Sequence, residues 1–247
     1  MKEELPQLAD RLRVRERPSG APIIFQSWGK LLFMHWQIPA AVIRQSIPDR
    51  LKIDTFEDNA WIAVTPFTMW DVRPIFTPPL PWVSSFHEIN VRTYVFLDGV
   101  PGVWFFSLDA NSSVAVKAAR TFFHLPYQKA SISLEQLGQR IVYVSTREEA
   151  GSGAQFTADW TIGEPLPEAE PGSLEFFLVE RYCLYSSYQG KLYRCRIHHQ
   201  PWPLQRASLS AYHSNLIEAD RLPTPTGQPL VHCGGPVKVE VWKLKEV

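Results

Sequence analysis

The residue types best suited to chemistry lie within one stretch of the sequence, Phe86–Asp109. Two runs rich in Val, Ile, Phe, Tyr and Trp flank short Asp-Gly and Pro-Gly pairs, a pattern that predicts a β-hairpin. Because side chains alternate between the two faces of a strand, Glu88, Asn90 and Arg92 share one face of the first run. A carboxylate in that setting can act as an acid or base, and a guanidinium can clamp a carboxylate ligand.

The second run of the hairpin adds further polar side chains to this face. If Leu97 and Gly102 are the last paired residues, Arg92 lies opposite Ser107 and Asn90 lies opposite Asp109. Polar and charged residues on so apolar a hairpin predict a polar-lined cavity that binds a small molecule. A buried structural ion network would give the same pattern, and the residue types alone favour neither interpretation.

Composition argues against several other classes of function. The 25 Lys and Arg residues balance the 25 Asp and Glu residues without a basic block, which argues against nucleic acid as the main partner. No apolar run is long enough to span a membrane, and the charged N-terminus lacks the apolar core of a signal peptide. The histidines and the three cysteines lack metal-ligand spacing, so we expect no metal and no cofactor, and reduced thiols in a cytoplasmic protein.

The pattern of the whole chain is mainly β, with two or three helices and no domain boundary within residues 1–247. Residues 1–20 are predicted to form a helical or frayed arm, and the proline-rich segment 71–82 an ordered wall or lid. Helices are expected at Ala40–Ser46, from Asn111 or Ser112 to Phe123, and at Ser173–Cys183 with Ser173 as N-cap. Besides the hairpin, the predicted strands are Lys30–Ile38, Leu51–Phe56, Ala60–Trp70, Gln128–Leu134, Arg140–Thr146, Gln155–Ile162, Lys191–His198, Ala207–Ser214 and Val237–Leu244.

Five blocks carry a resemblance to a known family: FHEINVRTYV, GVWFFSLDA, AARTFFHLPYQKA, ERYCLYS and HHQPWPLQRA. In this order they resemble the YqjF-like family of uncharacterised proteins, from about residue 25 to the end. That family is similar to a branch of the acetoacetate decarboxylase-like superfamily. The resemblance implies a closed antiparallel β-barrel with two or three flanking helices around a polar cavity.

The resemblance also identifies where this chain departs from the decarboxylases, which use a lysine pair in a motif close to Gly-Arg-x-x-x-Gly-Phe-Pro-Lys-Lys. The matching segment, 119–128, retains Arg120 and Pro126 but has Tyr127 and Gln128 in place of the lysines. Glu88 resembles the glutamate that lines the cavity in the superfamily. A phenol cannot form an imine, so we expect no Schiff-base decarboxylase.

Two cations near this motif remain candidates for other roles. Lys129 lies two residues beyond Tyr127 and on a strand would point to the same side, so it could be a displaced Schiff-base nucleophile. The apolar alternation of Ala130, Ile132 and Leu134 instead favours a Lys129 side chain that faces solvent. Arg120 falls near the C-terminal end of a predicted helix, where a cation interacts favourably with the helix dipole. This position fits a role in capping the helix at least as well as a role in binding a ligand.

Three functional hypotheses follow. The first is a cofactor-independent lyase or acid–base enzyme for a small carboxylated or keto substrate. In it Glu88 and Tyr127 are catalytic, and Arg92, Asn90, Ser107, Asp109 and Arg120 bind ligand. The second is a barrel that binds an organic acid or apolar metabolite without turnover. The third is an oligomeric scaffold with a vestigial cavity, and a homo-oligomer is compatible with each.

Overall fold

The structure is a computed structural model that describes residues 4–79, 84–149 and 151–247. Residues 80–82 of the predicted proline-rich wall lie outside this part. The helices are α1 Leu8–Arg15, α2 Ala40–Arg44, α3 Ser113–Phe123, α4 Leu174–Val179 and α5 Leu216–Ala219. The strands are β1 Ile24–Gly29, β2 Leu31–Ile38, β3 Lys52–Ile53, β4 Ala60–Pro74, β5 Phe86–Leu97, β6 Val100–Ala110, β7 Tyr127–Leu137, β8 Arg140–Arg147, β9 Gln155–Pro165, β10 Cys183–Tyr188, β11 Lys191–His198, β12 Leu204–Ser214, β13 Leu230–Gly234, β14 Val237–Val241 and β15 Lys245–Glu246.

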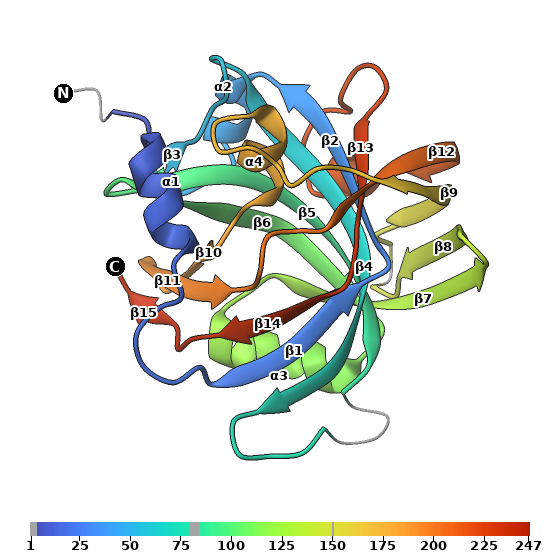
Figure 1. Ribbon diagram of the computed structural model, residues 1–247, viewed down its shortest axis with the longest axis horizontal. Helices are drawn as coiled ribbons and strands as arrows, with labels where there is room; N and C mark the ends of the chain where they lie inside the picture. Colours follow the sequence, from blue (N-terminus) through green and yellow to red (C-terminus); the bar gives the residue numbers. More distant parts are fainter. Residues whose placement is uncertain (1–3, 80–83, 150) are drawn as a thin grey trace.

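The mainly β prediction is confirmed, with two differences (Figure 1). Five helices, rather than two or three, occur in the described ranges. The strands are also not all antiparallel, because β6 pairs in parallel with β7 and with β10. No helix within the described residues has the length and apolar character needed to cross a membrane.

Strand pairing runs in two cycles that share β4, β5 and β6. The first cycle follows β1, β14, β11, β10, β6, β5 and β4, and β4 pairs back with β1. The second continues from β6 through β7, β8, β9, β12, β13 and β2 to β4. Each shared strand therefore has one face towards each cycle, and nearly all residues of β5 and of the first ten positions of β4 are buried, on both faces.

The two cycles have different interiors. The second is filled by apolar side chains that include Met34, Val91, Tyr143 and Trp160, all at most 1% exposed. In the first, Phe33, Phe67, Met69 and other apolar side chains surround a cavity. Figure 1 shows α4 and α3 on opposite sides of the first group of strands.

The central hairpin forms as predicted, but its register differs. Asp98 and Gly99 make a tight turn with φ of 51° and 70°, so the last pair is Leu97 with Val100. Arg92 of β5 pairs with Phe105 of β6, but the preceding residue Val91 pairs with Ser107. Phe106 is therefore an extra residue in β6. A one-residue bulge sends every following side chain to the other face.

The ends of the two helices beside the cavity also follow from local sequence. The Ser112 hydroxyl accepts a hydrogen bond from the Ala115 amide and caps α3, as one of the two predicted options. His124 ends α3 in the left-handed region at φ 53°. Ser173 caps α4, but α4 ends at Val179 rather than Cys183, because the chain leaves the helix at residues 180–182 and pairs with β11 from Cys183 onwards.

Candidate functional site

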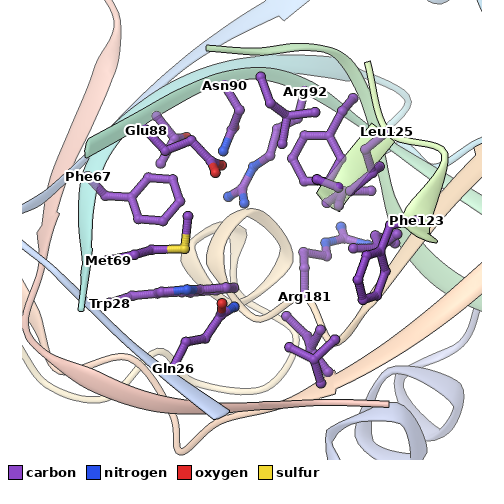
Figure 2. Close-up of a pocket in the computed structure, with 18 of the residues that line it drawn as sticks. Gln26, Trp28, Phe67, Met69, Glu88, Asn90, Arg92, Phe123, Leu125 and Arg181 are labelled. Carbon is purple, nitrogen blue, oxygen red and sulfur yellow. The ribbon is translucent and has the colours of Figure 1, made fainter. Parts of the chain in front are cut away.

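A cavity of 210 Å³ lies inside the first cycle of strands, between α3 and the end of α4. Its wall is mainly apolar and aromatic. Figure 2 shows Glu88, Asn90 and Arg92 directed into the cavity from β5, with Phe67, Met69, Trp28 and Gln26 around them. The predicted polar face of the first hairpin strand therefore borders this cavity.

Glu88 is the central ionisable group of this wall. Its side chain is 2% exposed, and burial raises its pKa from the usual 4.5 to about 7, although hydrogen bonds from Tyr127 and Asn90 favour the ionised form. Tyr143, on the other side of β5, donates a hydrogen bond to the Glu88 carbonyl oxygen at 2.9 Å and fixes the backbone there. A carboxyl group that titrates near neutral pH can both accept and release a proton.

Tyr127, at the start of β7, lines the cavity next to Glu88. Its hydroxyl donates to Glu88 Oε2 at 2.5 Å, and burial raises the pKa of Tyr127 well above its usual 10. The phenol therefore stays protonated and serves as a hydrogen-bond donor. The parallel pairing of Leu108 with Tyr127 brings β7 alongside β6 and positions this contact.

Arg92 points into the cavity with unsatisfied hydrogen-bonding groups. Its Nε and Nη2 are buried and have no hydrogen-bond partner among the residues described. Its guanidinium carbon lies 5.5 Å from the ring centroid of Phe33 and 6.0 Å from that of Tyr94. Aromatic faces compensate a partly buried cation only in part, so an anionic ligand would be stabilised here.

Arg181 is a second cation of the cavity wall, and it follows α4. Its Nη1 donates to Asp54 Oδ2 at 2.7 Å, while Nη2 is buried and unpaired within the described ranges. Asp54 also receives two hydrogen bonds from Arg11 of α1, at 2.6 and 2.7 Å. Two guanidiniums therefore share one carboxylate, and the trio keeps an excess positive charge beside the cavity.

Three polar atoms of other lining residues complete this picture. Trp28 Nε1, Thr65 Oγ1 and Asn90 Oδ1 are buried and, within the part of the chain described, unpaired. His199 also lines the cavity, but burial lowers its pKa to about 4 and its Nδ1 faces the Gln200 carbonyl oxygen at 2.7 Å. His199 is therefore a neutral ring at ordinary pH.

Ser107 and Asp109 do not share the cavity with Glu88, contrary to the predicted register. The bulge at Phe106 turns both towards the second cycle, where Asp109 accepts hydrogen bonds from Arg147 at 2.9 and 3.1 Å. The Ser107 hydroxyl donates to Asp220, whose pKa burial raises to about 6. For Ser107 and Asp109, the structure therefore has the buried ion network that was the alternative to a polar-lined cavity.

Arg120 and Lys129 also lie outside the cavity wall. Arg120 is exposed on α3 and donates to the Tyr127 carbonyl oxygen at 2.6 Å, so it holds the start of β7 rather than a ligand. Lys129 donates to Glu148 at 3.1 Å and to the Asn111 carbonyl oxygen at 3.2 Å. No lysine is among the described residues that line the cavity.

Sequence reasoning missed part of the wall. Gln26 and Trp28 belong to β1 and line the cavity. The alternation of side chains could have placed both on one face of a strand, but β1 is too short for its pattern to stand out in the sequence. Thr65 sits within the nearly unbroken apolar run of β4, which gives no sign of which face meets the cavity. In the described residues, no group of three or more His, Cys, Asp or Glu side chains is arranged to hold a metal ion.

Comparison with known proteins places the chain in a family. The model of domain of unknown function 2071, described as an uncharacterized conserved protein, matches residues 25–238. The chain belongs to this family. Within it, the chain is 40% identical over 229 residues to the uncharacterized protein YqjF of Bacillus subtilis (strain 168), covering 93% of this chain and 94% of YqjF. The resemblance of the five sequence blocks is thereby confirmed.

Several solved structures share the fold of this chain at low sequence identity. The enduracididine biosynthesis enzyme MppR, complexed with the condensation product of pyruvate and imidazole 4-carboxaldehyde, superposes with a TM-score of 0.65 at 10% identity, covering 92% of this chain and 90% of MppR. Acetoacetate decarboxylase of Legionella pneumophila gives 0.61 at 11% identity, covering 100% and 98%. The chain therefore has an acetoacetate decarboxylase-like fold.

Proposed function

We propose that this protein is a cofactor-independent acid–base enzyme acting on a small 2-oxo or related carboxylic acid, inside a closed barrel formed by the first cycle of strands. The observation that carries the proposal is the buried Glu88 carboxyl in the cavity, with its pKa raised by burial to about 7 and Tyr127 at 2.5 Å. Perturbed carboxyl groups in enclosed cavities are characteristic of proton-transfer sites.

Charge balance supports a carboxylate as the ligand's acidic group. With Glu88 ionised, Arg92 and the Arg11–Asp54–Arg181 trio leave one excess positive charge at the cavity. A monoanion would neutralise it. Arg92 and Arg181 both line the cavity, and their guanidinium carbons lie 6.0 and 4.7 Å from the Tyr94 ring centroid. We expect the ligand carboxylate to bind at this cationic side of the cavity.

The proposed step is proton transfer from the carbon next to the ligand's carbonyl group. Glu88 takes the proton, the C–H electron pair moves into the C–C bond, and the carbonyl oxygen becomes an enolate oxygen. Once protonated, Glu88 no longer needs the Tyr127 hydrogen bond, and the phenol can donate to the enolate. Return of a solvent proton from Glu88 to carbon completes the cycle without an imine.

A second candidate is a binding protein for an organic acid or apolar metabolite without turnover. The mainly apolar wall, with Phe67, Met69 and Trp28 near the carboxyl group, supports it, because apolar cavities with few polar groups are typical of ligand-binding sites.

Hydrogen–deuterium exchange separates the two. In deuterated buffer, we expect the protein to exchange the methyl protons of pyruvate well above the buffer background, measured by proton NMR. Pyruvate is the first probe because the same fold has been solved in MppR complexed with pyruvate. Thermal stabilisation by pyruvate with no exchange would support the binding protein. Neither effect with pyruvate or 2-oxobutyrate would contradict both.

Imine chemistry can be tested separately. Incubation with acetoacetate and borohydride should leave the protein mass unchanged, because the described residues that line the cavity include Tyr127, whose phenol cannot form an imine, and no lysine. An acetoacetate decarboxylase treated in parallel is the positive control. A mass increase mapped to Lys129 or Lys117 would overturn this part of the mechanism.

A further inference from the structure

The cavity has two chemically different ends. At one end of β5, Tyr94 donates to the Leu178 carbonyl oxygen of α4 at 3.0 Å, and Arg92 and Arg181 lie close to its ring. At the other end, the His87 amide donates at 2.9 Å to Asn111, which directly precedes α3. The cationic groups therefore lie towards α4, and Glu88 lies between them and the α3 end.

The α3 end is apolar and is kept open by small residues. Ala115, Ala118 and Ala119 of α3 line the cavity at the spacing that places side chains on one face of a helix. Phe86 of β5 and Met69 of β4 are paired in register on the opposite wall. No charged side chain belongs to this end among the lining residues described.

The size of the cavity limits what fits. An apolar cavity of about 150 Å³ holds benzene, with six non-hydrogen atoms. At the same density, 210 Å³ holds roughly eight or nine non-hydrogen atoms. Pyruvate would leave much of the α3 end unfilled.

We infer that the ligand is a monocarboxylic 2-oxo acid with a branched aliphatic tail of about four carbons, and that Ala119 helps to set this preference. The inference rests on the proposed function and adds the substrate class. The carboxylate lies at Arg92 and Arg181, the reacting carbon lies near Glu88, and the tail packs between α3 and Met69. A second carboxylate on the tail would be buried without a cation and is excluded.

Calorimetric affinities of three probes test this: pyruvate, 4-methyl-2-oxopentanoate and 2-oxoglutarate. The three additional carbons of 4-methyl-2-oxopentanoate should make it bind at least about tenfold more tightly than pyruvate, and 2-oxoglutarate should bind more weakly than pyruvate. In Ala119→Leu, the added side chain should abolish the advantage of the branched acid while pyruvate keeps its affinity within about threefold. Lys117→Leu, on the exposed side of α3, is the control and should leave all three affinities unchanged.

Each result has a defined meaning. The substrate class would be overturned if pyruvate and the branched acid bound with equal affinity, or if 2-oxoglutarate bound more tightly than pyruvate. Either result would leave the proposed function standing. Loss of pyruvate binding together with the branched acid in Ala119→Leu would overturn the role of Ala119. Failure of all three probes to bind the unsubstituted protein would overturn the proposed function itself.

Discussion

Replacing Glu88 with Gln should stabilise the protein at about pH 8 by about 3 kcal/mol relative to the unsubstituted chain. The folded-state pKa of Glu88 is raised by burial to about 7, above the usual 4.5. The folded protein therefore binds more protons than the unfolded chain between these values. The stability contribution of the protonated carboxyl is fully present below pH 4.5 and is lost as the pH rises through 7. Gln removes this loss because it stays neutral.

Urea unfolding across pH 4.5 to 8 measures the effect. The curves for the two proteins should coincide at the acidic end and separate as the pH rises. Glu148→Gln is a matched control, because Glu148 is half exposed and pairs with Lys129 at the surface, so its effect should stay within about 0.5 kcal/mol. Parallel pH profiles for the unsubstituted protein and Glu88→Gln would show that burial does not perturb this carboxyl group.

Replacing Arg92 with Met should weaken pyruvate binding at least about thirtyfold while changing the free energy of unfolding by less than about 1 kcal/mol. The guanidinium forms no salt bridge with the described residues, and Met fills a similar volume. The lost contacts with Phe33 and Tyr94 are offset because a partly buried cation no longer has to be desolvated.

Arg147→Met provides the opposite control, measured by the same calorimetry and urea unfolding. Arg147 pairs with the buried Asp109, so its removal strands a carboxylate and should cost about 3–5 kcal/mol of stability while leaving pyruvate affinity intact. If Arg92→Met instead unfolds easily and still binds pyruvate, Arg92 is a structural residue of the sheet.

The contrast between these two arginines also shows how far the sequence could predict the site. Alternation along an apolar strand was enough to place Glu88, Asn90 and Arg92 on one face, since nothing interrupts β5. It failed for Ser107 and Asp109 because the bulge at Phe106 depends on how β6 fits its neighbours, not on a local signal.

Helices and strands beyond the hairpin follow the same rule. Local capping by Ser112 predicted the start of α3 correctly. The helix predicted at Ser173–Cys183 was too long at its C-terminal end, because α4 ends at Val179 and Cys183 already begins β10, which pairs with β11 and β6. Arg11 and Asp54 carry no sequence signal linking them to Arg181, since that contact exists only after α1 packs on the sheet.

The most direct test of the central claim compares the exchange of pyruvate methyl protons by the unsubstituted protein and by Glu88→Gln in deuterated buffer at about pH 8. A base of this kind contributes roughly a hundredfold or more to proton transfer, so Glu88→Gln should lose at least that factor while still binding pyruvate. Equal exchange rates in the two proteins at the same pyruvate occupancy would contradict the assignment of Glu88 as the catalytic base.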